Sequence, residues 1–114
     1  MTRLVQRVVL AGPLVTVDEC KVHLRITDPA HDADLAQKVA VAESAILNYL
    51  GVDYVDDTWT PATAPREVTH AILLLACHYF EHRGDDLGAA RPTVAYIWGE
   101  LTELLKNIRP PALA

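Results

Sequence analysis

The segment 78–82, HYFEH, places two imidazoles and a carboxylate at a spacing that could support metal chemistry. On a helix, His78 and His82 lie one turn apart on the same face and could share a zinc ion, with Glu81 placed to activate a water molecule. A catalytic zinc needs a third protein ligand, and only His70 on the same helix or a carboxylate from a loop could supply it. A zinc hydrolase is therefore one hypothesis for this chain.

The competing interpretation of the same residues is structural. Glu67, His70, His78 and Glu81 share the one mostly polar side of an otherwise apolar helix. Polar stripes of this kind usually face solvent or a protein partner. We favour this interpretation, and we expect no catalytic residues, no bound metal and no cofactor.

The other reactive side chains also have simple structural interpretations. Cys20 and Cys77 lie within apolar helical patterns and lack a C-x-x-C partner, so we expect buried free thiols in a reducing compartment. The acids Asp53, Asp56 and Asp57 lack the spacing of a calcium loop, which favours a solvated turn. The five glycines form no phosphate-binding loop, so nucleotide binding has no support.

Composition sets broad limits on the class of protein. The chain has 114 residues, 51% hydrophobic and 22% charged, which predicts one globular domain spanning residues 1–114. Its net charge of -5 disfavours a general nucleic-acid binder, which needs a basic surface. No apolar run approaches the roughly 18 residues of a membrane span, and we expect neither a signal peptide nor a membrane partner.

The pattern of apolar residues and helix stop signals predicts an all-α fold, a compact bundle of about four helices. Thr16 and Glu19 form a capping box at the start of the first helix, and Gly51 ends the second. The third helix is apolar on every side in its middle, so it should be central. The expected segments are an extended arm over 1–15, a helical body over 16–108 with helices at about 16–26, 32–50, 65–83 and 92–108, and an extended tail over 109–114.

The expected fourth helix carries an apolar stripe with two possible roles. Val94, Ile97, Trp98, Leu101 and Leu105 occupy a narrow arc of its helical wheel. The stripe could close the core of the subunit, which is the default for an amphipathic helix. It could equally form an interface between subunits, with the tryptophan as an anchor.

Several segments together resemble a known family. The stretch 15–26, VTVDECKVHLRI, is similar to the V-T-L-E-E-A-K-x-H-L-R opening of phage head-tail connector proteins. The order that follows also matches: NYLG at 48–51, a loop tryptophan at Trp59, and AILLLACHYFEHR at 71–83 in place of the family's A-I-L-L-L-x-x-H-x-Y-E-x-R. Two departures are Leu47, where an acid is expected, and a fourth helix that is longer and more apolar than the family's closing segment.

The resemblance implies a structural, non-enzymatic role at the head-tail junction of the virion, after assembly in the host cytoplasm. Identical subunits would form a ring beneath the portal protein, dodecameric in the virion. The ring would extend the DNA channel without sequence-specific binding and receive a neck or tail-completion protein. The C-terminal segment 107–114 would dock against the portal. The candidate subunit or portal interface comprises Val94, Ile97, Trp98, Leu101, Leu105, Asn107, Arg109, Pro110 and Pro111, and the candidate polar interface stripe comprises Glu67, His70, His78 and Glu81.

Besides the zinc hydrolase, one further alternative stays open from the sequence. The chain could be a small helical regulator or adaptor that dimerises through the fourth helix. A strict dimer in solution would favour that alternative, whereas closed rings would favour the connector.

Overall fold

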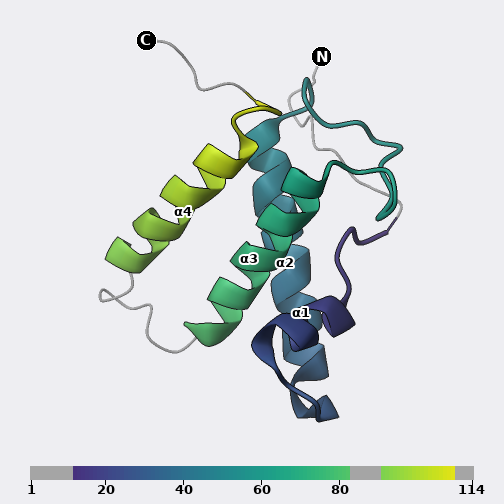
Figure 1. Cartoon of the computed structure of the whole chain (residues 1–114), viewed down its shortest axis with the longest axis vertical. Coiled ribbons are helices and arrows are strands. Elements are labelled where there is room, and N and C mark those ends of the chain that lie inside the picture. The colour runs from purple at the N-terminus through teal and green to yellow at the C-terminus, as the bar shows by residue number, and fades with distance from the viewer. Residues whose placement is uncertain (1–11, 83–90, 110–114) are drawn as a thin grey trace, which may run out of the picture.

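The computed structural model describes residues 12–82 and 91–109, and these contain four α-helices, one short 3₁₀ helix and no strand (Figure 1). The all-α prediction is confirmed. Residues 1–11 of the expected arm and residues 110–114 of the expected tail lie outside the described residues. The elements are α1 (Val17–Leu24), η1 (Pro29–His31), α2 (Asp32–Leu50), α3 (Arg66–Glu81) and α4 (Arg91–Leu105).

The ends of α1 follow from its local sequence. The predicted capping box is present, since the Glu19 amide donates to the Thr16 hydroxyl at 3.1 Å and the Thr16 amide donates to the Glu19 carboxylate at 2.8 Å. The helix ends at Leu24, two residues earlier than predicted. The reason is that Arg25 takes a left-handed conformation with φ of 61°, which ends the helical hydrogen-bond pattern.

The other helix ends match the prediction at most points. The helix α2 has the predicted bounds, and Gly51 follows it with φ of 81°. Pro65 immediately precedes α3. The helix ends at Glu81, before the predicted end at residue 83, because His82 already has a non-helical backbone conformation. The predicted stop at Gly84 lies outside the described residues. The helix α4 ends at Leu105, not at Ile108 as predicted, because the next residues form a turn in which the Ile108 amide donates to the Leu105 carbonyl at 2.9 Å.

In the part of the chain that the structure describes, the helix α3 packs against α1, α2 and α4, whereas the backbone of α4 lies beside that of α3 alone. Figure 1 shows α4 and α1 on different sides of α3. The central place predicted for the third helix is therefore confirmed. The buried core includes Leu35, Val39, Ala42, Ile46 and Leu50 of α2, Val68, Ala71, Ile72, Leu75 and Ala76 of α3, and Ile97, Leu101 and Leu105 of α4.

The end of the expected N-terminal arm belongs to this same core. Leu14 and Val15 are each only 2% exposed, and the Leu14 amide donates to the Glu43 carboxylate of α2 at 2.8 Å. Residues 14 and 15 therefore pack within the subunit, immediately before α1, which contacts α2 and α3.

Candidate subunit interface

The polar stripe of α3 divides into two parts by exposure. His70 and Glu81 are exposed, whereas Glu67 and His78 are half-buried. The His78 ring lies 4.4 Å from the His82 ring, measured between ring centroids. His70 and Glu81 are therefore the members of the stripe that are most available to a partner.

Two further findings concern metal-binding groups and membrane-spanning helices. Among residues 12–82 and 91–109, no group of three or more His, Cys, Asp or Glu side chains is arranged to hold a metal ion. No helix within these residues is long and apolar enough to cross a membrane.

The apolar stripe of α4 contributes mainly to the core of its own subunit. Leu101 and Leu105 are fully buried and Ile97 is 9% exposed, so these three side chains have little surface left for another subunit. Trp98 is half-buried, and its ring lies 5.9 Å from the ring of Tyr49 in α2. The side chain of Val94 is outside the described part of the structure. Of the stripe members whose side chains the structure describes, Trp98 is thus the one that reaches the surface.

Arg109 fastens the end of α4 to the end of α2. Its guanidinium donates a hydrogen bond to the Tyr49 backbone carbonyl and lies over the Tyr49 ring, 5.1 Å from the ring centroid. Both interactions join residues 60 apart in sequence. The clamp holds Arg109, the last residue that the structure describes, and Pro110 and Pro111 lie outside the described residues. Asn107, just before the clamp, is exposed.

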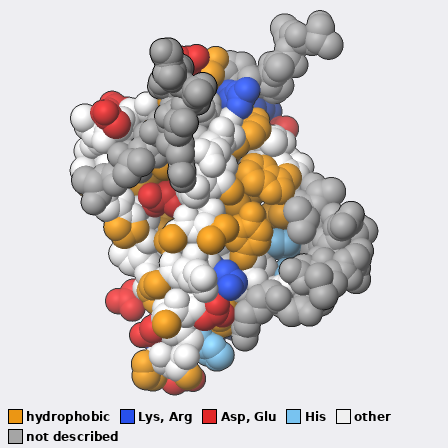
Figure 2. Space-filling view, turned by 180° about the vertical axis from the view of Figure 1, so that it is seen from behind, with side chains coloured by type: hydrophobic (Ala, Val, Ile, Leu, Met, Phe, Trp, Pro, Cys, Tyr) orange, Lys and Arg blue, Asp and Glu red, His pale blue; other side chains and the backbone are white. Residues whose placement is uncertain are grey.

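Apolar side chains also reach the surface away from the core. Val22 of α1 is 79% exposed and Val41 of α2 is 50% exposed. Figure 2 shows hydrophobic side chains gathered in the middle of the face opposite to the view of Figure 1. Such gathered apolar surface is a common feature of protein contact sites.

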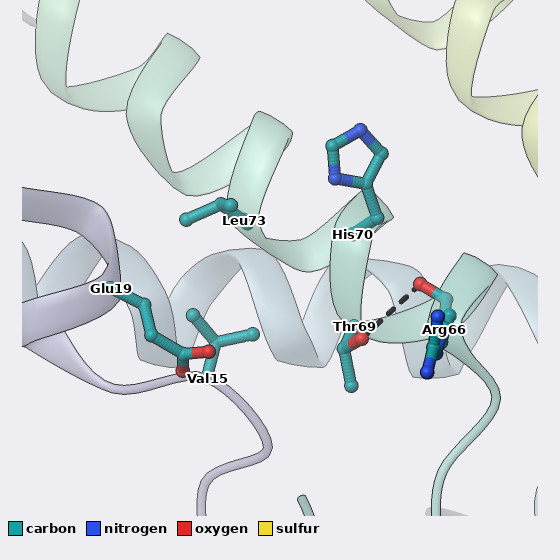
Figure 3. A pocket seen from close by; sticks show the side chains of 6 residues that line it. All are labelled: Val15, Glu19, Arg66, Thr69, His70 and Leu73. Carbon is teal, nitrogen blue, oxygen red and sulfur yellow. Dashed lines mark hydrogen bonds between the residues drawn. The ribbon is translucent and has the colours of Figure 1, made fainter. Parts of the chain in front are cut away.

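An open pocket of about 340 Å³ lies between the start of α1 and the start of α3 (Figure 3). One side carries Val15 and Glu19, and the other side carries residues of α3. One carboxylate oxygen of Glu19 already accepts the capping-box hydrogen bonds. The α3 side of the pocket consists of Arg66, Thr69, His70 and Leu73.

The chemistry of this pocket suits side-chain recognition. Arg66 and His70 are exposed and carry the basic groups, and Leu73 supplies half-buried apolar surface. Of the lining residues, only His70 had been singled out from the sequence as an interface candidate. The others escaped notice because the pocket forms only where two distant segments meet.

The two cysteines are both buried and free, as predicted. A hydrogen bond between the thiols lowers the pKa of Cys20. The same hydrogen bond, together with burial, raises the pKa of Cys77. Cys77 thus holds its proton and donates it to Cys20.

These features define the class of protein as a small all-helical subunit with mixed polar and apolar surfaces suited to assembly. The family model of the phage gp6-like head-tail connector protein matches residues 14–109. The match covers most of the chain, and the protein therefore belongs to this family of structural connectors, which is not a family of enzymes. No curated protein and no solved structure matched the chain.

Proposed function

We propose that the protein is a ring-forming subunit at the phage head-tail junction. The ring, dodecameric in the virion, sits beneath the portal protein, extends the DNA channel and receives the next neck or tail-completion protein. Assembly takes place in the host cytoplasm. The observation that carries the proposal is the match to the connector family over residues 14–109.

The surfaces of the subunit support a head-to-tail ring. A ring closed by rotation needs two different patches on each subunit, one meeting the other on the neighbour. The pocket lies between α1 and α3, and α4 lies on a different side of α3 (Figure 1). These two places supply the two patches.

The charges on the α3 side of the pocket are complementary to those on α4. The pocket presents the exposed cations of Arg66 and, when protonated, His70. Glu100 and Glu103 are exposed on α4, where Glu103 also pairs with Lys106. We place Glu100 of one subunit against Arg66 of the next, because opposite charges across an interface guide association and fix its register.

The end of α4 is the proposed contact with the portal. The clamp between Arg109 and Tyr49 holds the start of the tail in place, so Asn107, Pro110 and Pro111 would be presented from a fixed point. A fixed start lowers the ordering cost when the tail docks. The net charge of -5 suits a channel subunit, because weak phosphate contacts let DNA pass.

The mass of the purified protein in solution tests ring formation. Light scattering over a concentration series, with negative-stain imaging of the largest species, should show closed rings either alone or after addition of purified portal protein. A strict dimer with and without portal would contradict the proposal, and so would a chain that stays monomeric with portal present.

A charge exchange tests the proposed contact between subunits. Glu100→Arg and Arg66→Glu should each weaken ring assembly, and the double variant should restore it, because the exchanged charges again attract. Gln37→Arg is the matched control, since it adds a cation at an exposed position of α2. If both single variants assemble like the wild type, the proposed contact between Glu100 and Arg66 is wrong, whereas the proposal of a ring is unaffected.

A further inference from the structure

Cys20 is the buried residue of α1 and belongs to the core. It is the one fully buried side chain of this eight-residue helix, with 0% exposure. The helix packs against α3, where Cys77 is 2% exposed and belongs to the same core cluster. The two thiols are hydrogen-bonded to each other at this contact between α1 and α3. The chain contains no other cysteine.

The surroundings of the pair prepare it for oxidation. The hydrogen bond from Cys77 favours the thiolate of Cys20, the reactive form in thiol–disulfide exchange. Each thiol has one possible disulfide partner within the chain, because the sequence contains two cysteines in all. Burial keeps the pair away from outside reagents until α1 opens.

We propose that Cys20 and Cys77 form a covalent modification site, an intramolecular disulfide that staples α1 to α3 when the protein meets a disulfide oxidant. The Cys20 thiolate attacks one sulfur of oxidised glutathione, giving a mixed disulfide and releasing one glutathione thiolate. Cys77 loses its proton and attacks the Cys20 sulfur, which closes the protein disulfide and releases the second glutathione thiolate. Two protein thiols are oxidised and one glutathione disulfide is reduced to two glutathione thiols.

Oxidation would be triggered when the protein leaves the reducing cytoplasm, and this part of the proposal rests on the proposed virion location. Cytoplasmic thiol pools keep such pairs reduced, whereas a released particle is outside that protection. The bond would close a loop over residues 20–77. A loop of this length restricts the unfolded chain strongly, so oxidation should raise the midpoint of thermal unfolding by about 10 °C.

The experiment treats the full-length wild-type protein with oxidised glutathione under native conditions. Intact mass should fall by two hydrogen atoms. Proteolysis without reduction should then release one joined pair of fragments, containing Cys20 and Cys77. Two thiols that still react with an alkylating reagent, a lasting glutathione adduct, or bonds between chains would each overturn the proposal.

The route through opening of α1 has its own test. Thr16→Ala removes the hydroxyl that caps α1, which should make opening easier and speed oxidation about 5-fold. Thr60→Ala is the matched control, since it also removes an exposed hydroxyl that accepts backbone hydrogen bonds, here from Ala62 and Thr63 in the loop before α3. Equal oxidation rates in all three proteins would refute access through α1. Ring formation is measured separately by light scattering, so failure of the staple leaves the proposed function standing.

Discussion

Leu101→Ala tests whether the apolar stripe of α4 holds the subunit together. Leu101 is fully buried, and among the described helices α3 is the one whose backbone lies beside α4. Truncating a fully buried leucine removes its transfer free energy and leaves a cavity, which together cost about 2–4 kcal/mol. Because a small domain has a free energy of unfolding of about 5–15 kcal/mol, this loss is a large part of the total.

Urea unfolding followed by circular dichroism measures this loss, at a concentration where the protein is monomeric. With a slope of about 1–3 kcal/mol per molar urea, the midpoint should fall by about 1–3 M. Glu100→Ala is the matched control, since the preceding residue is exposed and its change should stay within about 0.5 kcal/mol.

The refuting result is specific. If Leu101→Ala unfolds at the same urea concentration as the wild type but loses assembly with its neighbours or with the portal, the side chain acts between subunits. The assignment of the stripe to the subunit core would then be wrong. A parallel fall in stability and assembly is the expected outcome, since an unstable α4 cannot present its outer face.

Three further outcomes follow from individual contacts. Arg109→Ala should lower the free energy of unfolding by about 1–2 kcal/mol, because it removes a hydrogen bond and a cation–π contact at the end of α2. Urea unfolding measures this loss, and an unchanged midpoint would contradict the clamp. Lys21→Met should lower the free energy of unfolding by at most about 1 kcal/mol, because the substitution breaks a 2.8 Å ion pair to the half-exposed Asp32. Adding salt should shrink this difference from the wild type, since salt screens the ion pair. A loss of stability that does not depend on salt would indicate lost packing instead. Thr58→Ala should raise the pKa of Asp56 in an NMR titration, because hydrogen bonds from Thr58 lower it. The lowered pKa means that the stabilisation is present above the unfolded pKa of about 3.9 and is lost as pH falls through the folded value, and an unmoved pKa would refute this cause.

Several features of the fold are determined by local sequence, and these were predictable. The capping box at Thr16 and Glu19 and the glycine at position 51 act through hydrogen bonds and backbone conformation within one turn of chain. The central place of α3 follows from its apolar middle, since a segment of helix that is apolar on every side must be covered by its neighbours. The family is also readable from segments such as 15–26 and 71–83, which the match over residues 14–109 confirms.

Other features depend on contacts between distant segments, and only the tertiary structure decided them. The sequence left the α4 stripe between core and interface, and the burial of Leu101 and Leu105 assigns these two to the core. The placement of Leu14 in the core, the pocket between α1 and α3, and the meeting of Cys20 with Cys77 had no local signal. The physical reason is that periodicity shows which face of a helix is apolar, whereas the packing of the whole chain decides what covers that face.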